Sequence, residues 1–132
     1  MSAVERLRRL RSETEALLGE VLKEASSVGA TLILFGSRAR GDHSLMSDYD
    51  LLAIYRDMPV KGGGIIVNVF NLKLEELEEE AYRSPLVLSA LLTGRVVLDG
   101  LGIEGALAEL RERLKTAGAR VESDRIVMPK RR

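Results

Sequence analysis

The residues best suited to chemistry lie in one stretch of the chain, between a glycine-serine pair and two alternating aspartates. Gly36 and Ser37 follow an apolar run, ten residues separate Ser37 from Asp48, and Asp50 lies two positions further on. Glycine lets a backbone turn and approach a ligand closely, and a serine offers a hydroxyl and an amide N–H to phosphate oxygens. The pattern therefore predicts a phosphate-binding loop beside a metal site.

The two aspartates are expected to face the same way. Residues 48–55 read as a strand, and side chains at positions i and i+2 of a strand point to one face. Two carboxylates suit Mg²⁺, which usually takes one or two carboxylates and completes its shell with water and phosphate. Arg38 and Arg40 add two cations whose forked donors fit phosphate oxygens. Asp48 and Asp50 are thus the predicted metal ligands, and the arginines are predicted phosphate contacts.

A simpler interpretation is an interaction domain in which both motifs are incidental. An Asp-x-Asp pair is common at strand ends, and a Gly-Ser turn is ordinary turn chemistry. The combination after a buried strand is much less common. A Walker-type phosphate loop is excluded, because no Gly-Lys-Ser/Thr follows the first glycine at the required spacing, and no Gly-x-Gly-x-x-Gly opens a helix.

The segments 34–41 and 48–52 together resemble the signature of the minimal nucleotidyltransferases, small members of the DNA polymerase beta-like nucleotidyltransferase superfamily. The resemblance implies that Gly36 and Ser37 hold the phosphates of a nucleoside triphosphate and that two aspartates hold Mg²⁺. It also implies a third carboxylate on the next strand. The expected reaction moves a nucleoside monophosphate, AMP from ATP in the first instance, onto an acceptor hydroxyl with release of pyrophosphate.

The same resemblance suggests a partner. Proteins similar to the minimal nucleotidyltransferases are often antitoxins paired with an all-helical HEPN ribonuclease toxin, which they bind or modify by adding AMP to a tyrosine. A chain of 132 residues has no room for a large acceptor-binding domain. A second subunit or a partner is therefore expected to complete the site.

One position departs from the family pattern. The next strand is predicted at residues 65–70, and the place of the third carboxylate falls on Asn68. An amide can lend a metal an oxygen, but it carries no charge and cannot act as a carboxylate base, whose assistance is typically worth ~10²–10⁴ in rate. The alternative function is thus a catalytically weak or inactive nucleotide-binding or partner-binding module. A different strand register, a swing of Glu75 or Glu76 into the site, or an acceptor acidic enough to need no base would each preserve catalysis.

Composition narrows the class of protein. A chain of 132 residues with 45% hydrophobic and 30% charged residues suits one domain, predicted at residues 1–119, with a tail at 120–132 whose basic end is expected to be disordered. A formal net charge of +0 gives no global field for a long nucleic acid. The absence of cysteine and the single His43 exclude cysteine-based and histidine-cluster metal sites. With no visible signal peptide or membrane-spanning run, the expected location is the cytoplasm.

The elements that must position the site alternate between helix and strand. The expected fold is α/β or α+β, with a small mixed sheet of about four or five strands and helices packed on one face. Ile33, Phe35 and Leu52 are expected beneath the first and last helices. Asp99 is predicted to be a turn residue before Gly100, and the glycine-rich segment 56–64 to be a hairpin connection. Strands are predicted at 31–35, 48–55, 65–70 and 95–99 and in the tail, and helices at 3–27, at 72–82, from Pro85 to Thr93 and at 103–117.

Overall fold

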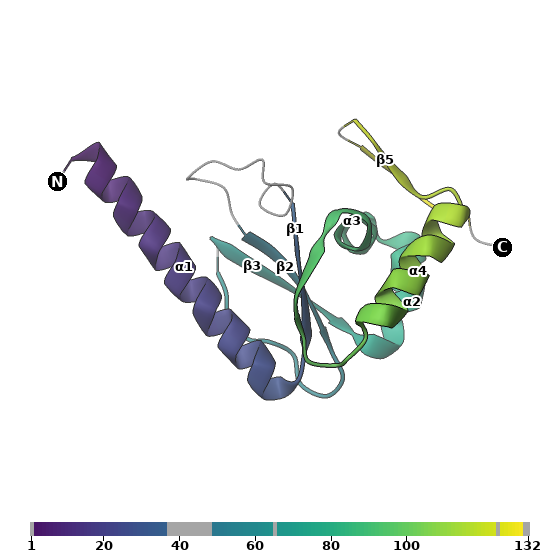
Figure 1. The fold of residues 1–132 in the computed structure, drawn as a ribbon, viewed down its shortest axis with the longest axis horizontal. Coiled ribbons are helices and arrows are strands. Elements are labelled where there is room, and N and C mark those ends of the chain that lie inside the picture. Colours follow the sequence, from purple (N-terminus) through teal and green to yellow (C-terminus); the bar gives the residue numbers. More distant parts are fainter. Residues whose placement is uncertain (1, 37–48, 65, 124, 131–132) are drawn as a thin grey trace.

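The computed structural model describes residues 2–36, 49–64, 66–123 and 125–130. A long first helix leads into three strands of a four-stranded sheet, two shorter helices precede the fourth strand, and a last helix and a small hairpin follow it (Figure 1). The helices are α1 (Ala3–Val28), α2 (Leu77–Arg83), α3 (Pro85–Thr93) and α4 (Glu104–Thr116), with a short 3-10 helix, η1 (Leu74–Glu76), before α2. The strands are β1 (Thr31–Phe35), β2 (Tyr49–Tyr55), β3 (Val67–Lys73), β4 (Arg95–Asp99), β5 (Arg120–Glu122) and β6 (Arg125–Val127).

Helix α1 begins and ends at residues that cap it. The Ser2 side chain accepts a hydrogen bond from the Glu5 N–H at 3.1 Å and so caps the start of the helix. At the other end Gly29 adopts a left-handed φ of 72°, and its N–H donates to the carbonyls of Ala25 and Ser26. The sharp stop at Gly29 delivers the chain directly into β1. No helix among the described residues has both the length and the apolar character needed to cross a membrane.

The main sheet has the order β3-β2-β1-β4, and it mixes two kinds of pairing. Strand β1 lies between β2 and β4 and is antiparallel to both, whereas β2 and β3 are parallel. The predicted mixed sheet of four strands is confirmed. The predicted hairpin at 56–64 is wrong. Because β2 and β3 are parallel, the segment between them must cross over and return the chain to the end of the sheet at which β2 begins.

Side chains of α1 and β3 hold the crossover segment 56–64 in place. The side-chain amide of Asn71 on β3 accepts from the Val60 N–H at 2.9 Å and donates to the Val60 carbonyl at 2.8 Å. The Glu24 carboxylate on α1 accepts from the N–H groups of Lys61 and Gly62 at 2.7 and 2.8 Å. Backbone groups that a hairpin would have paired are therefore paired by side chains from two other elements.

Helices cover both faces of the sheet, which corrects the expectation of helices on one face. Leu32 and Leu34 of β1 pack with α1, whereas Ile33 and Phe35 pack with α2, α3 and α4 on the opposite face. Figure 1 shows α1 on one side of the strands and α3 and α4 on the other. All five residues of β1 are buried, and a strand buried on both faces needs cover on both. Ile33, Phe35 and Leu52 thus lie beneath the later helices and not beneath α1.

Helix α3 follows its capping signal, whereas the helix before it begins later than predicted. Helix α3 begins at Pro85, and the Ser84 side chain accepts from the Val87 N–H at 3.3 Å. The helix predicted to start at residue 72 starts later, because Leu72 and Lys73 complete the pairing of β3 with β2. Strand pairing thus outweighs the helical pattern at these two positions.

The tail forms a hairpin of its own. Strands β5 and β6 pair antiparallel as a separate two-stranded sheet and do not extend the main sheet, and the Lys130 N–H donates to the Ala117 carbonyl at 2.8 Å. This corrects the expected edge strand. The basic end predicted to be disordered includes residues 131 and 132, which lie outside the described residues.

Candidate functional site

Three neighbouring strands bring the candidate residues together at one end of the sheet. Gly36 directly follows β1, whose last residue, Phe35, pairs with Asp50 on β2. Asp50 in turn pairs with Asn68 on the parallel strand β3. The end of β1 and the starts of β2 and β3 therefore place Gly36, Asp50 and Asn68 side by side, although 32 positions separate the first from the last in the sequence.

Gly36 is required here by conformation and by space. Its φ is +82°, in the left-handed region that residues with a side chain rarely adopt. A Cβ added at this position would lie 2.9 Å from Oδ2 of Asp50, closer than carbon and oxygen pack. The glycine thus lets the chain turn out of β1 directly against the aspartate carboxylate.

Asn68 contacts the other oxygen of the Asp50 carboxylate. Its Nδ2 donates to Oδ1 of Asp50 at 3.0 Å. The register pairs the two residues directly, so the strand alignment predicted from sequence is the one observed. An amide in contact with Asp50 gives the pair one negative charge, where two carboxylates would give two.

The structure rules out one substitute for a third carboxylate. Glu75 and Glu76 lie in η1, beyond the far end of β3. Glu75 is seven positions after Asn68, and a strand rises roughly 3.3 Å per residue, so the two are separated by roughly 20 Å along the sheet. Glu75 also pairs with Lys73 at 4.0 Å. Neither glutamate can swing into the site.

Asp99 lies at the opposite end of β1, and its carboxylate is occupied by the chain itself. It pairs with Thr31 across the sheet, accepts from Thr31 Oγ1 at 2.8 Å, and accepts from the N–H groups of Ile103 and Glu104 at 2.9 and 3.0 Å. Burial raises the pKa of Asp99, but the hydrogen bonds outweigh it and hold the pKa below its ordinary value. Its prediction as a turn residue is confirmed.

The sequence matches a family model along most of the region that builds this site. The model describes a nucleotidyltransferase domain and matches residues 15–92, more than half of the chain. The chain belongs to the nucleotidyltransferase domain family. The match runs from within α1 almost to the end of α3, so it includes all three strands that meet at Gly36, Asp50 and Asn68.

A solved structure is also similar. It is a candidate nucleotidyltransferase from Sulfolobus solfataricus, 18% identical, and the alignment covers 70% of this chain and 86% of that chain with a TM-score of 0.45. No curated protein sequence matches the chain.

A nucleotidyltransferase domain implies a nucleoside triphosphate and, usually, a divalent metal, and the described residues supply part of a shell for one. Asp50 offers a hard carboxylate oxygen, Oδ2, beside Gly36, while Oδ1 accepts from Asn68. Within the described part of the chain no group of three or more Asp, Glu, His or Cys residues could hold a metal by itself. This donor set fits a Mg²⁺-like ion that takes few protein ligands and completes its shell with water and phosphate.

Four predicted site residues lie outside the described residues: Ser37, Arg38, Arg40 and Asp48. Their roles as phosphate contacts and metal ligand stay predictions.

Phe70 is a neighbour of this site that no motif indicates. It pairs with Leu52 on β2, two positions beyond the pairing of Asn68 with Asp50, so it shares their face of the sheet. The alternation of side chains along β3 is the signal that could have found it. Phe70 is 38% exposed, and its ring lies 6.1 Å from that of Phe35.

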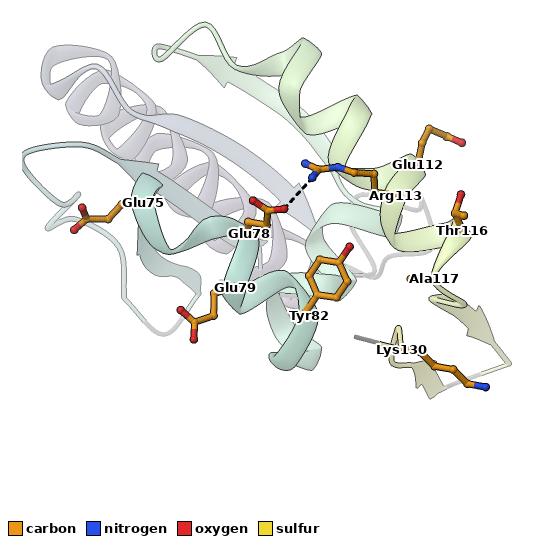
Figure 2. A pocket seen from close by; sticks show the side chains of 9 residues that line it. All are labelled: Glu75, Glu78, Glu79, Tyr82, Glu112, Arg113, Thr116, Ala117 and Lys130. Atoms are coloured by element: carbon orange, nitrogen blue, oxygen red, sulfur yellow. Dashed lines mark hydrogen bonds and ion pairs between the residues drawn. The ribbon is translucent and has the colours of Figure 1, made fainter. Parts of the chain in front are cut away.

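A large cavity lies elsewhere and is lined by paired charges. It has a volume of about 970 Å³, and Figure 2 shows Glu78 and Tyr82 of α2 directed toward Arg113 and Thr116 of α4. Arg113 pairs with Glu78 at 2.8 Å, and Glu79 pairs with Arg83 at 3.5 Å. Glu75, Glu78 and Glu79 follow the end of β3 that lies away from Asn68. This cavity is therefore separate from the Gly36 site. It is lined by Glu75, Glu78, Glu79, Tyr82, Glu112, Arg113, Thr116, Ala117 and Lys130.

Proposed function

We propose that this protein is a Mg²⁺-dependent nucleotidyltransferase that moves AMP from ATP to an acceptor hydroxyl. The observation that carries the proposal is the contact of Gly36, at a left-handed φ, with the Asp50 carboxylate on the adjacent strand. A backbone turn held against a carboxylate is the arrangement expected where a phosphate-binding loop adjoins a cation ligand, and it supports the proposal. Membership of the nucleotidyltransferase domain family supports the same conclusion.

The proposed roles divide between binding and charge balance. Gly36 and Ser37 hold the triphosphate through backbone N–H groups and a hydroxyl, and Arg38 and Arg40 offset its negative charge. Asp48 and Asp50 hold Mg²⁺, which when bound neutralises phosphate charge. Asn68 fixes the orientation of the Asp50 carboxylate through its 3.0 Å hydrogen bond.

A second candidate function follows from the same hydrogen bond. With Asn68 as a donor to Asp50, the described site has no second carboxylate that could accept a proton from the acceptor hydroxyl. The protein would then bind the nucleotide or its partner and transfer AMP weakly or not at all. The two candidates share the binding step and differ only in the chemical step.

The proposed acceptor is a tyrosine of a small, all-helical HEPN-type toxin, with this protein as the antitoxin. The support is the resemblance of segments 34–41 and 48–52 to the minimal nucleotidyltransferases. A phenol is more acidic than an alkyl hydroxyl, with a pKa of about 10. A tyrosine acceptor therefore reduces the demand for the base that Asn68 does not provide.

The test is transfer of label from α-³²P-ATP in the presence of Mg²⁺, with and without the candidate helical partner. Label on the partner that is lost in Asp50→Asn would establish the transferase. No label with the starting protein, but label with Asn68→Asp, would support the binding module instead.

Binding is tested separately by thermal unfolding. A ligand that binds only the folded state at a hundred times its dissociation constant stabilises by about 2.7 kcal/mol. ATP with Mg²⁺ should raise Tm in the starting protein. If neither ATP nor other nucleoside triphosphates raise Tm or transfer label, the transferase and the nucleotide-binding module both fail, and only a module that binds the partner alone is left.

A further inference from the structure

An aromatic ring lies exposed on the same face of the sheet as the proposed site. Phe70 is 38% exposed on the edge strand β3, whereas Phe35, against which it packs, is 7% exposed and belongs to the core. The two rings are inclined by 53° with centroids 6.1 Å apart. This is a geometry that aromatic pairs favour, so the buried ring supports the exposed one.

The position of Phe70 relative to Asp50 and Asn68 sets it apart from other exposed apolar residues. Isolated exposed apolar side chains are normal, and Val97 on the other edge strand is equally exposed at 38%. Phe70, however, follows Asn68 by two strand positions on one face, a separation of roughly 6.6 Å along the strand. Phe70 therefore lies on the same face as Asp50, one strand over and two positions further along the sheet.

We propose that the exposed face of Phe70 is the surface on which the base of the bound nucleoside triphosphate stacks. This inference rests on the proposed function, since it takes the phosphates to bind at Gly36 and Asp50. A nucleotide held there by its phosphates has its sugar and base extending away from the metal ligand. Phe70 offers a π face within that reach, anchored from below by Phe35.

The chemistry of an aromatic platform predicts what it will recognise. Every nucleobase has a π face, so stacking discriminates by ring area more than by hydrogen-bond pattern. Purines, with two fused rings, should bind more tightly than pyrimidines. The chain has no tryptophan and only two phenylalanines, and Phe35 is buried, so Phe70 is the phenylalanine available for this role.

The experiment compares the binding of ATP, CTP and inorganic tripolyphosphate by calorimetry in the presence of Mg²⁺. The variants are Phe70→Leu, which keeps apolar volume without a ring, and Phe70→Tyr, which restores a ring. Val97→Ala serves as a control at an equally exposed residue of the other edge strand. Unfolding curves of each variant show whether the fold is retained.

We expect Phe70→Leu to weaken ATP binding by about 5- to 100-fold, the range measured for single base-aromatic stacks. Tripolyphosphate binding should stay unchanged, the preference for ATP over CTP should shrink, and Phe70→Tyr should bind ATP like the starting protein. Unchanged ATP affinity in Phe70→Leu would overturn the inference, as would equal weakening of ATP and tripolyphosphate. Failure of the starting protein to bind any of the three compounds would refute the proposed function itself, and the inference with it.

Discussion

An aspartate lies beside each end of β1, and the two carboxylates differ in their hydrogen-bond partners. At one end Asp99 accepts hydrogen bonds from Thr31, Ile103 and Glu104. At the other end Asp50 accepts from the side chain of Asn68. A glycine rather than a side chain lies against its second oxygen.

Among the residues that the structure describes, this difference separates a carboxylate whose two oxygens accept hydrogen bonds within the fold from one whose second oxygen accepts none. Asp99 closes the turn between β4 and α4, and its acceptors are used within the fold. Asp50 keeps an oxygen at the end of the sheet, next to a backbone turn suited to phosphate. Both are aspartates near the end of a strand, so the distinction comes from their neighbours and not from residue type.

The largest expected effect is at Asn68, which lies where the third carboxylate of the family pattern is expected. Asn68→Asp should increase AMP transfer by ~10²–10⁴, because it supplies a base beside Asp50. Without a divalent cation the variant should be less stable than the starting protein, since two adjacent carboxylates repel each other, and Mg²⁺ should restore its stability. Label transfer and denaturant unfolding with and without Mg²⁺ measure these effects.

Asn71→Asp is the matched control on the same strand. It adds the same charge but removes the hydrogen bond to the Val60 carbonyl. It should lose stability with or without Mg²⁺ and gain no transfer activity. If Asn71→Asp and Asn68→Asp respond alike to Mg²⁺, the charge at position 68 has no special relation to Asp50.

The next effect is at the glycine turn. Gly36→Ala places a Cβ 2.9 Å from the Asp50 carboxylate and should displace it, and a misplacement of about 1 Å can cost about 100-fold in rate. Nucleotide affinity should fall as well. Both are measured with the labelled-ATP and calorimetric assays.

Gly102→Ala is a control that separates the backbone strain of a left-handed φ from the contact of the new Cβ with a carboxylate. Gly102 has a similar φ of +70°, but a Cβ there would meet nothing within 4 Å. The variant should lose about 1–2 kcal/mol of stability from the left-handed backbone and keep full nucleotide affinity. A loss of affinity in Gly102→Ala equal to that in Gly36→Ala would contradict the role given to the Asp50 contact.

At the opposite end of β1 the expected effect is on stability. Asp99→Ala should lower the free energy of unfolding by about 1–3 kcal/mol, because it leaves Thr31 and two backbone N–H groups without their acceptor. Asp50→Ala should cost less than about 1 kcal/mol, since it removes one acceptor from a partly exposed amide. Equal losses in the two variants, measured by urea unfolding, would show that Asp50 is structural too.

The smallest effect is the pH dependence that Asp99 contributes. Its pKa is lowered on folding from the ordinary 3.8, so its stabilisation is complete above that value and is lost as the pH falls through the folded-state pKa. The stability difference between the starting protein and Asp99→Asn should be constant from neutral pH to about pH 5 and shrink below about pH 4. A difference that grows with acidification would contradict this sign.

Local signals predict most of the elements. The caps at Ser2 and Ser84, the stop at Gly29 and the alignment of Asn68 with Asp50 are all as the sequence indicates. Each depends on neighbours in sequence or on the alternation of a strand. Four consecutive apolar residues in β1 are also typical of a strand covered on both faces, so the expectation of helices on one face neglected a signal that the chain contains.

Long-range pairing could not be predicted in the same way. Nothing local in segment 56–64 distinguishes a hairpin from a crossover, because the choice depends on Glu24 in α1 and Asn71 in β3. The distance of Glu75 from the site and the support of Phe70 by Phe35 likewise depend on which strands become neighbours. The polar groups of the candidate site are therefore visible in the sequence, whereas the contacts between them come from the fold.

The central claim is that the end of β1 at Gly36 and Asp50 binds the nucleotide, and the opposite end does not. Calorimetric titration of Mg²⁺ and ATP into the starting protein, Asp50→Asn and Asp99→Asn tests it most directly. The account predicts binding by the starting protein and by Asp99→Asn with similar affinity, and at least about tenfold weaker binding, or about 1.4 kcal/mol, by Asp50→Asn. Undiminished binding by Asp50→Asn would contradict it.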